Sequence, residues 1–371
     1  MKYIRQLDSI RAIAVLLVII SHWFSPYSLI NYIPNGAIGV DVFFVLSGFL
    51  ITSILLENKK LAEAHHHTKS TTLKNFYARR VLRIFPVYYI FIFLLLIFHN
   101  HTRTNIKPAF PYFVSYTSNY YFFIRQEWDG MLSHLWSLSV EEQFYLLWPW
   151  VIIFIQARYL LHAIIVFILT GIAMQYIFID NIMADVLTTN CFDSFGFGAL
   201  LAWQRVYKPG IQQKFFKYLS IAALLALISG LAELFNKKLL LLPARTNVSI
   251  MAMWLIAYVV YNHDNNRLRL KWLFDNSWMI FIGKISYAIY LYHLVVPQLT
   301  DGLVYRIANI HTEDIHSPKW LEMLIKGGNF LVLISISWLS WKIIEKPFLN
   351  LKKYFVYEKN ADTGRQPITA D

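Results

Sequence analysis

A cation and an imidazole in one apolar segment are the first residues that could do chemistry. Arg11 and His22 lie in the run LDSIRAIAVLLVIISHW, eleven residues apart. In an α-helix this spacing places both on one face within about 20°, roughly 16 Å apart along the axis. Ionisable groups inside a membrane are costly and mark function by default, although Arg11 could snorkel to the headgroups and His22 could bond a neighbouring helix. We favour a functional His22, because imidazole exchanges a proton near neutral pH.

Acidic side chains in two later segments could assist this imidazole. Asp41 lies early in GVDVFFVLSGFLI, at a depth where it could orient or charge-balance His22; the alternative is that it caps its helix. Glu141 and Glu142 lie in HLWSLSVEEQFYLLWPW. Ser139 and Glu142 have the spacing of a capping box. The glutamates could therefore have a structural role at the start of the helix. The alternative is that one of them orients the base or binds an acceptor.

Three arginines lead into the third apolar run, in the segment NFYARRVLRIFPVYY. Arg80 and Arg83 are three residues apart and therefore neighbours on one helical face. Two guanidinium groups in this arrangement form a fork suited to phosphate. The alternative is ordinary anchoring to anionic lipid. The sequence thus indicates a site for an anionic ligand.

The remaining histidines and the one cysteine carry less information. His293, in IGKISYAIYLYHLVV, could bind an acceptor or form a hydrogen bond within the bundle, and we favour the bond. The run 65–67 is three adjacent histidines in a polar loop, where we expect solvated side chains and no metal. Cys191 is the only cysteine, so an intramolecular disulfide is excluded.

A bundle of membrane-spanning helices must position these side chains. Of the 371 residues, 57% are hydrophobic and 15% are charged, against roughly 25% charged in soluble domains. The pattern predicts an all-α integral membrane protein with about ten transmembrane helices and no separate soluble domain. A window of about 19 residues places the spans near 11–30, 37–56, 82–98, 136–155, 160–179, 191–204, 219–235, 248–261, 277–297 and 327–344.

The distribution of basic residues predicts the orientation of these helices. With the N-terminus in the cytoplasm, 24 of the 34 Lys and Arg residues fall on cytoplasmic segments, in line with the positive-inside rule. We therefore expect both termini to be cytoplasmic and the net charge of +12 to reflect basic loops, not a nucleic-acid partner. The outer segment 236–247, which carries Arg245, fits poorly. The N-terminus shows no small-residue cleavage site, so we expect a retained first helix.

Six ordered blocks resemble the membrane acyltransferase-3 family, which includes O-antigen and other cell-envelope O-acetyltransferases. They cover about residues 5–348, so we take 1–348 as a transmembrane acyltransferase domain and 349–371 as a cytoplasmic polar tail. Many relatives carry a hydrolase-like domain after the membrane part, which we expect to be absent here. Ser9 and Ala12 stand where relatives usually have glycine. The blocks are LDSIRAIAVLLVIISHW, GVDVFFVLSGFLI, FYARRVLRIFPVYY, HLWSLSVEEQFYLLWP, CFDSFGFGALLA and IGKISYAIYLYHLVVP.

The resemblance implies a multi-pass protein of the cytoplasmic (inner) membrane that takes an acyl group, usually acetyl, from cytoplasmic acetyl-CoA. The acceptor would be a hydroxyl of a cell-envelope glycan, such as lipopolysaccharide, or of a lipid-linked saccharide. His22 falls on the family's histidine and would act as general base or transient acyl carrier. Arg80 and Arg83, with Arg11, would hold the nucleotide end of the acyl-CoA.

We assign Asp41 and Glu142 to the catalytic group around His22 and expect no metal. The partners expected are acyl-CoA, the saccharide acceptor and membrane lipid. The rival hypothesis from another class is a proton-coupled transporter of an anionic solute, in which the same arginines and His22 line a pathway. The oligomeric state cannot be predicted from the sequence.

Overall fold

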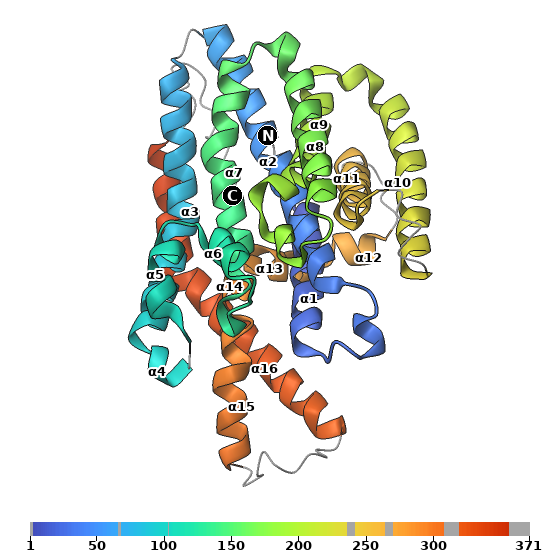
Figure 1. The fold of residues 1–371 in the computed structure, drawn as a ribbon. Helices are drawn as coiled ribbons and strands as arrows, with labels where there is room; N and C mark the ends of the chain where they lie inside the picture. Colours follow the sequence, from blue (N-terminus) through green and yellow to red (C-terminus); the bar gives the residue numbers. More distant parts are fainter. Residues whose placement is uncertain are drawn as a thin grey trace.

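The chain folds into a bundle of helices that stand side by side (Figure 1). In this computed structural model α15 (Val295–Ile307) and α16 (Lys319–Ser340) extend beyond one end of the bundle. The described part of the chain contains no β-strand, so the predicted all-α class is confirmed. His66, His67 and the end of the polar tail lie outside the described residues, which are 3–65, 68–102, 104–235, 242–263, 270–307 and 319–355.

Seven helical segments of the described chain are long and apolar enough to cross a membrane. Three predicted spans are not among them. Helix α7 (Leu135–Phe154) is long enough but contains the polar run 141–143, α9 (Phe192–Tyr207) has only 16 residues, and the region 277–297 is broken. The count of ten spans and the cytoplasmic termini stay predictions. The seven segments are Gln6–Trp23, Asn35–Glu63, Lys69–Ile97, Ala157–Ile177, Pro209–Glu233, Ala244–Asn262 and Lys319–Tyr354.

The first three long helices differ in their limits from the predicted spans. Helix α1 (Gln6–Trp23) ends before residue 30, because Phe24 is extended and Pro26 follows. Helix α2 (Asn35–His65) and helix α3 (Lys69–Ile97) are both longer than the apolar runs inside them. Thr68 caps α3 by accepting a hydrogen bond from the backbone N–H of Thr71. The arginines of α3 therefore lie inside a continuous helix and not at its start.

Glycines bring particular helices into close contact. A Cβ on Gly198 of α9 would lie 2.0 Å from the carbonyl oxygen of Val45 in α2, and one on Gly283 would lie 1.8 Å from the carbonyl oxygen of Asp8 in α1. Small residues permit such contact between membrane helices. The second contact holds α1 against α13 (Ser277–Lys284), and so places Arg11 beside the broken segment.

The predicted span 277–297 is interrupted twice. It forms α13, α14 (Ser286–Tyr292) and α15, with breaks at Ile285 and at residues 293–294. Pro297 has no N–H to donate to the carbonyl four residues earlier, and that carbonyl, of His293, instead accepts a 2.8 Å hydrogen bond from the indole of Trp23. The second break is thereby joined to the end of α1.

The predicted capping box at Ser139 and Glu142 is wrong. Helix α7 begins at Leu135, so Ser139 is already inside it, where backbone amides bond to carbonyls one turn earlier. The Ser139 hydroxyl lies 2.8 Å from the hydroxyl of Ser118 at the start of α6 (Ser118–Arg125). The glutamates of α7 are thus not needed at a helix end.

Candidate active site

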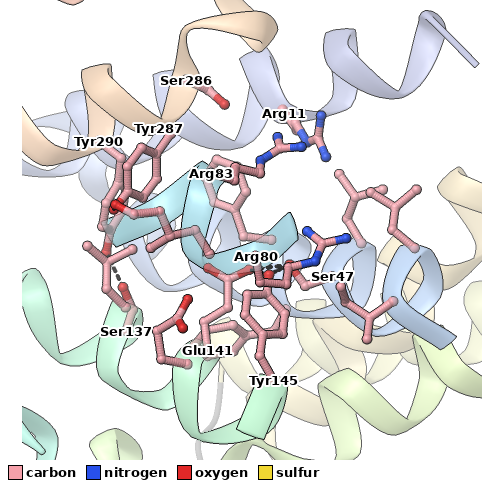
Figure 2. A pocket seen from close by; sticks show the side chains of 18 of the residues that line it. Arg11, Ser47, Arg80, Arg83, Ser137, Glu141, Tyr145, Ser286, Tyr287 and Tyr290 are labelled. Carbon is pink, nitrogen blue, oxygen red and sulfur yellow. Dashed lines mark hydrogen bonds between the residues drawn. The ribbon is translucent and has the colours of Figure 1, made fainter. Parts of the chain in front are cut away.

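One cavity lies among α1, α2, α3, α7 and α14, with about 870 Å³ of unfilled space that is partly open to solvent. Figure 2 shows the guanidinium groups of Arg11, Arg80 and Arg83 toward one end and Ser137 with Tyr290 at the other. The predicted ligand-binding arginines, which come from α1 and α3, are therefore brought together. The other polar residues that line the cavity are Ser47, Glu141, Glu142, Tyr145, Ser286 and Tyr287.

The three arginines differ in their partners within the protein. Arg11 Nη1 donates a 2.8 Å hydrogen bond to Asp8 Oδ1. The guanidinium of Arg80 lies over the ring of Tyr145, 5.5 Å from its centroid. Within the described residues neither Arg80 nor Arg83 donates a hydrogen bond or pairs with a carboxylate within 4 Å. Both residues are half-buried in the cavity wall, and guanidinium groups with free donors are suited to an anionic ligand.

Arg79, next in sequence to Arg80, turns away from the cavity. Its Nη1 donates to the carbonyl oxygens of Lys352 and Phe355, at 3.2 Å and 3.3 Å. The segment 352–355 therefore contacts α3. Only two of the three arginines in the motif face the site.

The two neighbouring glutamates of α7 both line the cavity but have different surroundings. Glu141 Oε1 accepts short hydrogen bonds from the hydroxyls of Ser47 and Tyr145. Glu142 makes no hydrogen bond within the described residues, and it interacts electrostatically with Arg80 and Glu141. Glu142 is thus the carboxylate that is free to meet a ligand.

Tyr290 separates this cavity from a cluster of three histidines. Its hydroxyl forms a hydrogen bond with the hydroxyl of Ser137 and donates one to the carbonyl oxygen of His134 at 3.1 Å. The Tyr290 ring centroid lies 5.5 Å from the ring centroids of both His134 and His293. The side chain of Tyr290 therefore lies between the end of the cavity and the rings of His134 and His293.

His22 belongs to this histidine cluster and not to the cavity wall. Its Nδ1 lies 3.2 Å from His293 Nε2 and 2.9 Å from the carbonyl oxygen of Val18. His22 is exposed, whereas His293 and His134 are buried. The shared face predicted for Arg11 and His22 agrees with this placement, because both face the α13–α15 segment: Arg11 shares the cavity with residues of α14, and His22 contacts His293.

Asp41 does not contact His22. Its Oδ1 accepts a 2.9 Å hydrogen bond from Nε of Arg245, and both side chains are almost fully buried. Arg245 lies in α11 (Ala244–Asn262) and also donates to the carbonyl oxygen of Asn190 at 3.2 Å. This buried ion pair explains why Arg245 departs from the distribution of basic residues expected for an outer loop.

Sequence analysis missed several residues that the fold adds to the site. His134 lies in one of the recognised blocks, but a single histidine there suggests no partner. Glu345 is buried in a π-helical turn, Trp341–Glu345, with Oε1 lacking a partner, and it interacts electrostatically with Arg83. The predicted span 327–344 ends one residue before Glu345, so the rule that acids inside apolar spans mark function would have found Glu345 only with a longer span.

A sequence model described as an acyltransferase domain, that of the acyltransferase-3 family, matches residues 4–341. The chain belongs to this family. The predicted family resemblance is thus confirmed, and with the seven apolar helices it makes the chain a multi-pass membrane protein. No solved structure gives a significant match.

Curated relatives with similar sequences include the peptidoglycan O-acetyltransferase OatA of Listeria monocytogenes, 28% identical over 98% of this chain. A candidate O-acetyltransferase of Staphylococcus aureus (strain COL) and the candidate peptidoglycan O-acetyltransferase YrhL of Bacillus subtilis are each 28% identical, over 94% and 93% of the chain. The matches cover 60%, 58% and 55% of these relatives. The chain therefore spans little more than half of their length.

Proposed function

We propose that this protein is an O-acyltransferase of the cytoplasmic membrane that moves an acyl group, acetyl in the first instance, from acyl-CoA to a hydroxyl of a cell-envelope glycan. The observation that carries the proposal is the pair Arg80 and Arg83. Both guanidiniums line a cavity, and within the described residues neither forms a hydrogen bond or an ion pair within 4 Å. Tyr290 at the end of this cavity contacts His293, which in turn contacts His22. The names of the relatives favour peptidoglycan or its lipid-linked precursor as the acceptor.

In this proposal the donor and the acceptor approach from opposite sides. Arg80, Arg83 and Arg11 bind the phosphates of acyl-CoA from the cytoplasm by charge-assisted hydrogen bonds. The acyl end extends toward Tyr290, and His22 receives the proton of the acceptor hydroxyl at the outer side. Glu142 lines the same cavity, and we assign it to the catalytic group that acts with His22.

The test is thioester turnover by the purified protein in detergent. Acetyl-CoA and a peptidoglycan fragment are supplied, free CoA thiol is measured, and the glycan is analysed by mass spectrometry. We expect thiol release and O-acetylated glycan together. His22→Ala should abolish transfer while CoA binding remains, because only the proton acceptor is removed. Full activity of this variant would contradict the assigned role of His22.

The broken helices of the 277–297 region are also a feature of transporters, so a proton-coupled carrier of an anionic solute is the second candidate. Proteoliposomes loaded with labelled acetyl-CoA separate the two functions. A carrier moves intact acetyl-CoA across the bilayer, and no thiol appears. We expect thiol to appear only when acceptor is present and intact acetyl-CoA to stay on its own side.

A further inference from the structure

The hydrogen bonds around His293 determine which of its ring nitrogens carries the proton. Its Nδ1 lies 2.6 Å from the carbonyl oxygen of Tyr290, and its Nε2 lies 3.2 Å from Nδ1 of His22. A carbonyl can only accept, so Nδ1 of His293 must donate. In a neutral ring Nε2 is then left as an acceptor that faces His22.

The same argument applies to His22. Its Nδ1 lies 2.9 Å from the carbonyl oxygen of Val18, which again can only accept. Nδ1 of His22 therefore carries the proton and directs it toward Val18 and toward Nε2 of His293. The other nitrogen of His22, Nε2, keeps its lone pair. A general base needs an unprotonated nitrogen, and in this tautomer Nε2 is that nitrogen.

We propose that His293 is a positioning residue that holds the His22 ring with Nε2 unprotonated and stabilises the imidazolium that forms when Nε2 takes a proton. This inference rests on the proposed function. The acceptor hydroxyl gives its proton to His22 Nε2 as its oxygen bonds to the thioester carbon. The carbon–sulfur bond breaks, and the CoA sulfur receives the proton from His22. His293 acts here as the carboxylate does in a Ser-His-Asp triad.

The neighbours of His293 favour this role over simple packing. His293 is fully buried, and its carbonyl is bound by the indole of Trp23, the residue that follows His22. His134 does not compete for Nε2 of His293, because its own ring nitrogens lie 3.0 Å and 3.2 Å from the carbonyl oxygens of Met131 and Leu291. Asp41, the other residue expected to orient His22, is held by Arg245.

Two substitutions of His293 separate positioning from packing. In His293→Asn the amide nitrogen can donate to the Tyr290 carbonyl, as Nδ1 does, but the shorter side chain has no atom that accepts the hydrogen bond from Nδ1 of His22. In His293→Gln the amide oxygen can take the place of Nε2 as acceptor. We expect His293→Asn to lower kcat on the order of 100-fold with unchanged affinity for CoA, and His293→Gln to recover kcat to within tenfold of the wild type. Equal losses in the two variants, or no loss in either, would overturn the proposal.

A second measurement does not depend on activity. In protein labelled with ¹⁵N-histidine, the resonances of His22 are assigned by their absence from His22→Gln. We expect the wild-type spectrum to show protonated Nδ1 and unprotonated Nε2 at His22, and His293→Asn to show exchange between tautomers. A proton on Nε2 of wild-type His22 would overturn the inference. Failure of the wild-type protein to transfer acetyl groups, with this spectrum intact, would overturn the proposed function alone.

Discussion

Asp41 and Arg245 form a buried ion pair between α2 and α11, with 2.9 Å between Oδ1 and Nε. Removal of one partner leaves an unpaired buried charge, which costs about 3–5 kcal/mol. We therefore expect Arg245→Leu to lower the thermal unfolding midpoint of the protein in detergent strongly. The measurement is the unfolding midpoint of wild type and variant at equal protein concentration.

The double variant Asp41→Leu, Arg245→Leu is the control for this pair. Apolar replacement of both members of a buried ion pair is often neutral or stabilising, so we expect much of the lost stability to return. We also expect its turnover to stay within tenfold of the wild type, because Asp41 does not contact His22. A stable double variant without turnover would instead support the role of Asp41 in orienting His22 that the sequence predicts.

Arg83→Ala should raise the KM for acetyl-CoA by about 10- to 100-fold, with a smaller change in kcat. A charge-assisted hydrogen bond to phosphate contributes about 1.5–3 kcal/mol, and among the described residues Arg83 forms no hydrogen bond or ion pair within 4 Å that would replace the ligand. The check is the KM and the dissociation constant of CoA. Arg79→Ala is the matched control: it removes contacts to the 352–355 segment and should leave both constants unchanged. Unchanged CoA affinity in Arg83→Ala would refute the assignment.

The two glutamates of α7 should respond differently to amide substitution. Glu141→Gln keeps the oxygen that accepts from Ser47 and Tyr145, so we expect turnover close to wild type. Glu142→Gln removes the charge of the carboxylate that has no hydrogen bond in the described chain, and we expect kcat to fall on the order of 100-fold. Turnover of both variants at saturating acetyl-CoA checks this. The reverse order of effects would show that Glu141 is the functional acid.

The contact between α2 and α9 should not tolerate a methyl group. In Gly198→Ala the new Cβ would lie 2.0 Å from a backbone oxygen of Val45, and overpacking of this kind costs about 1–3 kcal/mol or more. We expect a clear fall in the unfolding midpoint. Gly230→Ala in α10 (Gln212–Phe235) is the control, because no atom lies within 4 Å of the added Cβ. Here stability should stay constant or rise slightly, since alanine favours helix more than glycine does.

Local chemistry in the sequence was enough to predict the class of the fold and many of the residues in the site. Apolar runs predict helices in a membrane because each run is long and almost free of charge. Arg80, Arg83 and Glu142 stand out because charged side chains in such runs are costly. The spacing of Arg80 and Arg83 also predicts that they share one face, and both line the cavity.

Only the tertiary structure decided which distant groups meet. Asp41 could have faced His22, but 204 residues later in the chain Arg245 takes its carboxylate. His293 contacts His22 across a separation of 271 residues, and its carbonyl oxygen, which Pro297 cannot bond, accepts a hydrogen bond from Trp23. The period of a helix determines which residues share one of its faces. The partner of that face depends on packing between helices, which sequence spacing along one helix does not encode.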